Sequence, residues 1–158
     1  MCDIEAEPAL AAGARFAPCI GMKSILVGVD GSAESACAAR LAAGIARASN
    51  RQLVFAHVLA PVTTLPAPVP SAGDDERTRA ARHMLEAFAQ REASWGTDPQ
   101  IEVLTGNPAD VLSRRAAEGD VDLVVVGHRG RGAVARALLG SVADRLVQLS
   151  PAPVLVAR

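Results

Sequence analysis

The chain is poor in aromatic residues, which limits the surfaces that it can offer to a partner. Aromatic side chains make up 3% of the 158 residues, too few for the stacking platforms on which proteins hold unpaired bases. The 16 Lys and Arg residues are balanced by 17 Asp and Glu residues, for a formal net charge of −1. Domains that bind nucleic acid are basic, so this balance argues against a nucleic acid as partner.

Cysteine is also scarce, with Cys2, Cys19 and Cys37 in the whole chain. An odd number without the spacing of metal ligands predicts neither a disulfide framework nor a zinc site. No run reaches the roughly 18 apolar residues that span a membrane. The acidic first residues do not resemble a secretory signal. We therefore expect a cytoplasmic protein without a membrane partner.

The composition is that of one folded domain, because half of the residues are hydrophobic and the length suits a single unit. Residues 1–21 are rich in Ala and Pro and lack a clear period, so a flexible extension is predicted there. The domain is expected over residues 22–158. Within it, Ala60–Asp75 contains four prolines and is predicted to be a long surface loop.

Strand-like and helix-like segments alternate along the domain. Apolar, β-branched runs predict strands at Ser24–Val29, Leu53–Val58, Ile101–Leu104, Val121–Val126 and Val154–Ala157. Helices are predicted from Ser32 to about Ser49, at Glu76–Ser94, from Asn107 to Gly119 and at Ser141–Ser150. This order predicts the α/β class: an open five-stranded parallel sheet with helices on both faces. The flavodoxin-like strand order 3-2-1-4-5 fits five strands joined by right-handed crossovers.

Polar residues mark the expected helix starts. Ser32 and Asn107 are predicted N-caps, and Pro108 follows Asn107 at the first helical position, which suits proline. Ser141 and Asp144 have the spacing of a capping box at the start of the last helix.

Two loops are expected to meet at one edge of this sheet. The predicted order places the first and fourth strands side by side, with the switch point between them, and ligands bind at the carboxyl ends of strands at such a point. Asp30-Gly-Ser32 follows the first strand, and the glycine-rich segment 127–141 follows the fourth. Glycines can bring bare backbone N–H groups against a phosphate, so nucleotide binding is the leading hypothesis.

The glycine-rich segment does not match the two commonest phosphate motifs. In a Walker A loop, Ala133 and Val134 would stand where Lys and Ser or Thr are needed. A dinucleotide fingerprint needs an acid after the next strand, and here that strand is followed by Arg158 alone. The remaining pattern is Gly127-x2-Gly130-x9-Gly140-Ser141.

With this pattern, the sequence resembles the universal stress protein family over residues 22–158. The family has Gly-x2-Gly-x9-Gly-Ser/Thr after its fourth strand, and every fixed position matches. The resemblance extends to Ile25–Ser32, Gly106–Pro108 and Ser150–Val156. It implies a fold like that of the adenine-nucleotide α-hydrolases, a homodimer that pairs through the last strand, and, in the nucleotide-binding branch, bound ATP. We expect Mg²⁺ to accompany the ATP.

The resemblance also implies a base end and a phosphate end for the site. It places Asp30 at the adenosine and Val58 against the adenine. Arg129 is added as a phosphate partner because it lies inside the motif.

At the phosphate end, the resemblance implies that Gly127 and Gly130 let the backbone approach the ribose and phosphates. It implies that Gly140, Ser141 and Val142 supply N–H groups and a hydroxyl. The position of Ser141 at a helix N-terminus supports this independently, because unpaired N–H groups and the helix dipole favour an anion there.

Structural explanations stay open beside these assignments. Gly127 and Gly130 could serve only a tight turn, Asp30 could cap the first helix, and His57 could be a packed histidine. No catalytic constellation emerges, so at most weak ATP hydrolysis is expected. The resemblance implies a cytoplasmic, ATP-binding sensor or regulator of the stress response. A nucleotide-independent dimeric interaction module and a slow ATPase are the alternatives.

Overall fold

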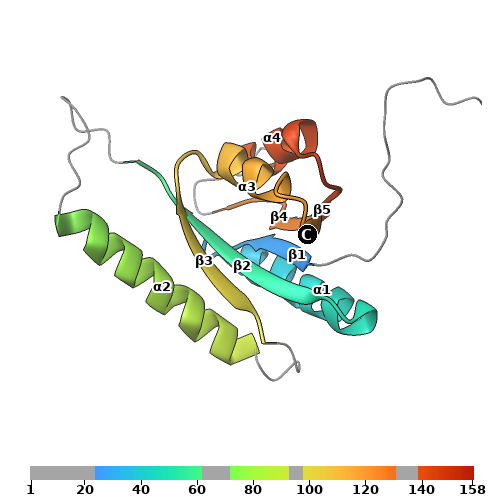
Figure 1. The fold of residues 1–158 in the computed structure, drawn as a ribbon, viewed down its shortest axis with the longest axis horizontal. Helices are drawn as coiled ribbons and strands as arrows, with labels where there is room; N and C mark the ends of the chain where they lie inside the picture. Colours follow the sequence, from blue (N-terminus) through green and yellow to red (C-terminus); the bar gives the residue numbers. More distant parts are fainter. Residues whose placement is uncertain (1–23, 62–71, 93–97, 131–138) are drawn as a thin grey trace, which may run out of the picture.

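The computed structural model describes residues 24–61, 72–92, 98–130 and 139–158. In these residues, strands and helices alternate along the chain, in agreement with the prediction (Figure 1). The elements are β1 (Ser24–Gly28), α1 (Ala33–Ser49), β2 (Gln52–Leu59), α2 (Ala72–Glu92), β3 (Gln100–Thr105), α3 (Pro108–Ala116), β4 (Val121–Gly127), α4 (Ser141–Leu149) and β5 (Val154–Ala157). The strands form one parallel sheet in the order β3-β2-β1-β4-β5. The predicted fold class and strand order are confirmed.

The sheet is covered on both faces, and β1 lies at its centre. Helices α1 and α2 cover one face, whereas α3 and α4 cover the other (Figure 1). Successive β1 residues point to opposite faces, so Ile25 and Val27 belong to the first core layer and Leu26 to the second. All three side chains are fully buried. This two-sided burial explains why the strand is a continuous apolar run rather than an alternating one.

Two of the three predicted helix caps are present. Ser32 Oγ accepts a hydrogen bond from the Ser35 N–H at 3.1 Å, and this caps α1. Asn107 Oδ1 accepts from the Ala109 N–H at 3.2 Å, with Pro108 as the first helical residue of α3. These contacts satisfy N–H groups that have no partner within their own helices.

The capping box predicted at the last helix is wrong. The N-cap of α4 is Gly140, whose carbonyl accepts from the Asp144 N–H at 2.9 Å. Ser141 is therefore already the first helical residue, one position too late for its hydroxyl to cap the helix. In the part of the chain that the structure describes, no side chain caps α4.

Two helix boundaries differ from the prediction by three or more residues. Helix α3 ends at Ala116 rather than Gly119, which lies in the following turn with φ +86°. Helix α2 begins at Ala72, inside the predicted loop 60–75. Residues 62–71 of that loop, the extension 1–21 and Ser94 lie outside the described residues. None of the described helices is long and apolar enough to cross a membrane.

A charged cluster holds α3 against the sheet. The Arg115 guanidinium donates to Glu102 of β3 at 2.9 Å and to Asp120, just before β4, at 2.6 Å. The Arg115 side chain is 12% exposed. The two carboxylates raise its pKa above the ordinary value, so the guanidinium stays charged and keeps α3 attached to both strands.

We predict that Gly44→Ala stabilises the protein by about 0.5–1 kcal/mol. Gly44 lies on the exposed side of α1, and nothing in the described structure is within 4 Å of an added Cβ. Alanine would therefore improve helix propensity without a clash. Urea unfolding followed by circular dichroism measures the change.

Gly119→Ala is the matched control, because its Cβ would also meet open space but its φ of +86° disfavours alanine. We expect this variant to be less stable than the wild type. Equal stabilisation of both variants would contradict the prediction.

Candidate functional site

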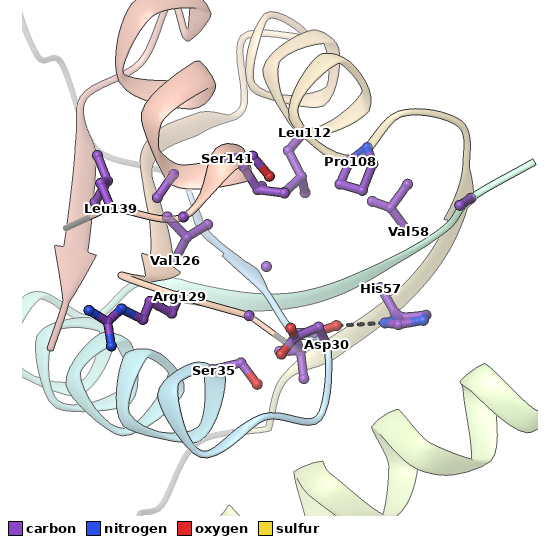
Figure 2. A pocket seen from close by; sticks show the side chains of 18 residues that line it. Asp30, Ser35, His57, Val58, Pro108, Leu112, Val126, Arg129, Leu139 and Ser141 are labelled. Atoms are coloured by element: carbon purple, nitrogen blue, oxygen red, sulfur yellow. Dashed lines mark hydrogen bonds between the residues drawn. The ribbon is translucent and has the colours of Figure 1, made fainter. Parts of the chain in front are cut away.

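A cavity of ≈ 680 Å³ opens at the carboxyl ends of the central strands (Figure 2). Every predicted site residue lines it, namely Asp30, Val58, Gly127, Arg129, Gly130, Gly140, Ser141 and Val142. Because β1 pairs with both β2 and β4, the loops that follow these strands meet around one space. The expected convergence at the switch point is thus present in the structure.

Most of the cavity wall is aliphatic. Val58 and Pro108 line one end, and Val126 and Leu139 lie toward the other (Figure 2). Leu112 of α3 lies between them. The sequence analysis did not identify Pro108, Leu112 or Leu139 as lining residues. The start of α3 could have pointed to Pro108, since helices that follow parallel strands begin at the same edge of the sheet.

Asp30 and Gly130 are in direct contact across the switch point. A Cβ atom added to Gly130 would lie 2.6 Å from Asp30 Oδ2. The other carboxylate oxygen accepts from the Ser32 N–H at 2.9 Å and from the Ser32 hydroxyl at 2.5 Å. Asp30 therefore supports the residue that caps α1 and also forms part of the cavity wall. The Asp30 carboxylate thus has a structural role at the start of α1 and at the same time lines the candidate site.

Gly127 meets the start of α1 rather than open space. An added Cβ would lie 2.8 Å from the Glu34 carbonyl carbon. Its φ is not in the left-handed region, so the requirement for glycine is close packing of α1 on the end of β4. This reason differs from the one proposed from the sequence, which was approach to a phosphate.

Backbone hydrogen bonds bring the start of α4 back to the end of β4. The His128 N–H donates to the Ala157 carbonyl of β5 at 2.7 Å, and the Gly140 N–H donates to the His128 carbonyl at 2.7 Å. An added Cβ at Gly140 would lie 3.2 Å from this same His128 oxygen. Residues 131–138, between these ends, lie outside the described residues.

The start of α4 differs from the starts of α1 and α3, which also reach the cavity through Ser35 and Pro108. Side chains cap α1 and α3, whereas no side chain of the described residues caps α4. The N–H groups of its first turn are therefore open to an external acceptor, and the helix dipole makes this position attractive to an anion. Ser141 is exposed and adds a hydroxyl there.

Among the described residues that line the cavity, the ionisable side chains are those of Asp30, His57 and Arg129. His57 Nδ1 lies 2.7 Å from the Val29 carbonyl oxygen at the end of β1 (Figure 2). The Arg129 side chain points away from the middle of the cavity (Figure 2). Over the described part of the chain, no group of three or more acidic, His or Cys side chains could hold a metal ion.

Comparison with known proteins identifies a family for this architecture. The model of the universal stress protein family matches residues 21–158. A putative universal stress protein of Staphylococcus aureus (strain USA300) is 30% identical over 142 residues, which cover 88% of this chain and 86% of the relative.

Solved structures show the same similarity. Universal stress protein UspA from Lactobacillus plantarum is 26% identical, with a TM-score of 0.74, and the match covers 87% of this chain and 98% of UspA. A universal stress protein in complex with cAMP is 31% identical, with a TM-score of 0.64, and the match covers 86% and 96% of the two chains.

We predict that Gly127→Ala destabilises the protein by about 1–3 kcal/mol, a typical cost of overpacking. The added methyl group would press on the Glu34 backbone, which is held in the first turn of α1 and cannot rotate away. Urea unfolding measures the loss.

Gly130→Ala is the comparison, because among the described residues its methyl group would meet the Asp30 carboxylate, a side chain that can turn. We expect a smaller loss of stability than for Gly127→Ala. The reverse order would show that the packing against Glu34 is not the constraint.

Proposed function

This chain belongs to the universal stress protein family, and on that premise we propose that it binds ATP with Mg²⁺ in the cavity and serves as a nucleotide-dependent regulator of the stress response. One observation carries the proposal. The uncapped N-terminus of α4 and the aliphatic wall around Val58 border the same cavity. The first suits phosphates and the second suits a planar base, so one nucleotide can satisfy both.

The register of β2 supports adenine as the base. In a parallel ladder, the N–H and C=O of one residue point to the same neighbouring strand. The Ala56 carbonyl accepts from Val29, so the Val58 groups, two residues later, also point toward β1. The β1–β2 pairing ends at Gly28 and Ala56. The N–H and C=O of Val58 therefore face the switch point beyond the end of the ladder.

These two groups complement adenine. An N–H donor suits adenine N1, which accepts, and a carbonyl suits the exocyclic N6 amine, which donates. Hypoxanthine and guanine present an acceptor and a donor in the opposite order. A buried polar pair that is left unmatched costs about 1–3 kcal/mol per group, so this edge favours adenine. The relative in complex with cAMP carries the same base.

The side chains around the cavity fit a Mg²⁺ ion held largely by the nucleotide. Asp30 is the carboxylate of the cavity lining. Mg²⁺ keeps several waters and is commonly bound by one or two carboxylates together with phosphate oxygens. Phosphates at the start of α4 would supply those oxygens. The Mg²⁺ ion would enter together with ATP and neutralise part of the phosphate charge.

The hydrogen bonds of the titratable groups support a binding role over hydrolysis. Asp30 Oδ1 is engaged by Ser32, and His57 Nδ1 by the Val29 carbonyl. Both contacts orient the loop walls, as expected of a holder for the ligand. A bound nucleotide would stabilise the folded state by mass action. The stability of the protein would then depend on the nucleotide concentration, which is how the site could report on it.

We also propose that two copies pair through β5, the edge strand next to β4. The carbonyls of Pro153 and Ala157 accept from β4 and its loop. By alternation, the backbone groups of Val154 and Val156 point outward from the sheet, where a second β5 strand could pair with them.

We predict that isothermal titration calorimetry detects ATP binding, and that inosine 5′-triphosphate binds at least about tenfold more weakly because of the reversed base edge.

Gly130→Val is expected to lower ATP affinity by at least about tenfold while the circular dichroism spectrum is retained. Its side chain would displace the Asp30 carboxylate and enter the cavity. Gly44→Ala, which is remote from the cavity lining, is the control.

Absence of ATP binding by the wild type at millimolar ligand would overturn the proposed function. Equal affinity for ATP and inosine 5′-triphosphate would overturn the assignment of Val58 to the base. Unchanged ATP affinity in Gly130→Val would return Gly130 to a structural role.

For the dimer, we predict that Val156→Pro is monomeric in sedimentation equilibrium whereas Val156→Ala remains dimeric. Both variants lose the valine side chain, but only proline removes the outward N–H group. A dimer of unchanged affinity in Val156→Pro would place the interface elsewhere.

A further inference from the structure

We propose that His57 is a positioning residue that keeps the Val58 N–H open for the base, an inference that rests on the proposed nucleotide site. The imidazole does so by taking the backbone acceptor with which that N–H would otherwise pair. The His57 side chain contacts the Val29 carbonyl at the end of β1 (Figure 2).

The hydrogen-bond pattern at the end of β1 carries the argument. In a parallel ladder, a residue that donates to residue j−1 of its neighbour accepts from the N–H of residue j+1. The Val29 N–H donates to the Ala56 carbonyl at 2.8 Å. The Val29 carbonyl should then accept from the Val58 N–H, and this bond would extend the β1–β2 ladder by one step.

The structure has a different bond at that place. The Val29 carbonyl oxygen lies 2.7 Å from His57 Nδ1, and the strand pairing stops at Gly28 and Ala56. Because a carbonyl can only accept, the proton must be on Nδ1, and His57 is the donor. In the described part of the chain, the Val58 N–H is thus outside the ladder and lies at the cavity wall.

A second contact engages the backbone carbonyl two residues beyond Val58. The Ala60 carbonyl, just beyond β2, accepts from Arg77 Nη2 of α2 at 2.8 Å. The Ala56 carbonyl is taken by Val29. Val58 therefore lies between two residues whose backbone carbonyls are already engaged by other groups.

Loss of the imidazole donor is expected to let the Val58 N–H pair with the Val29 carbonyl, so that the N–H is no longer available to the base. In His57→Leu, the carbonyl of the buried Val29 loses its partner, and a buried carbonyl without a hydrogen bond is costly. The Val58 N–H is the nearest ladder donor and would replace it. In His57→Asn, the side-chain amide carries an N–H at the position of Nδ1, so it can keep the carbonyl occupied.

Hydrogen exchange of the Val58 amide, followed by NMR, tests this without a ligand. We expect rapid exchange in the wild type and in His57→Asn. In His57→Leu, exchange should slow by about tenfold or more, because the amide enters the sheet. Slow exchange in the free wild type, or equally rapid exchange in His57→Leu, would overturn the proposal.

Nucleotide selectivity provides the functional readout. We expect His57→Leu to lose about tenfold in ATP affinity and little in affinity for inosine 5′-triphosphate, so that the preference for adenine disappears. His57→Asn should keep the preference. A merely structural role would weaken both nucleotides together, and that result, or a preference unchanged in His57→Leu, would overturn the proposal.

The two measurements separate failure of this inference from failure of the proposed function. If the wild type binds no nucleotide, the proposed function fails and the role of His57 in base recognition fails with it. If the wild type prefers ATP but His57→Leu keeps both rapid Val58 exchange and that preference, only the role of His57 is overturned.

Discussion

The pairing of β1 with β4 at the centre of the sheet is the constraint on which the site depends. It brings the loop after each strand to one edge, where Asp30 lies against Gly130. The contact is so close that a single Cβ atom would break it. The start of α1 packs equally closely on Gly127. Gly127 and Gly130 are therefore required first by the close packing of the segments that follow β1 and β4. The cavity lies beside these contacts.

Unpaired backbone groups give this cavity its chemical character. Ser32 and Asn107 satisfy the first turns of α1 and α3, whereas α4 begins at Gly140 without a side-chain cap. At the Val58 end of the cavity, the β1–β2 ladder stops one step before Val58. Each opening is costly in an empty protein, because buried backbone groups are almost always hydrogen-bonded. A nucleotide that hydrogen-bonds to both sets of backbone groups would gain affinity, because the folded protein already holds these groups open and in place.

Much of this arrangement could be predicted from local patterns. The alternation of strands and helices predicted the parallel sheet, and the glycine spacing identified the residues on either side of 131–138 that line the cavity. The caps at Ser32 and Asn107 were correct because an N-cap depends on one turn of chain. Ser141 was placed wrongly because serine and glycine both suit an N-cap, and only the backbone path out of β4 selected Gly140. The start of α2 was missed because its first residues follow a proline-rich stretch.

The sequence by itself determined the kind and order of the elements, and with them the edge of the sheet at which the cavity lies. Periodicity and chain direction decide these, and both are local properties. Only the tertiary structure decided which polar groups remain open at that edge. His57 meets the Val29 carbonyl across 28 positions of sequence, and Gly130 meets Asp30 from another strand. Such competition for one acceptor, or for one small space, exists only when the strands lie side by side.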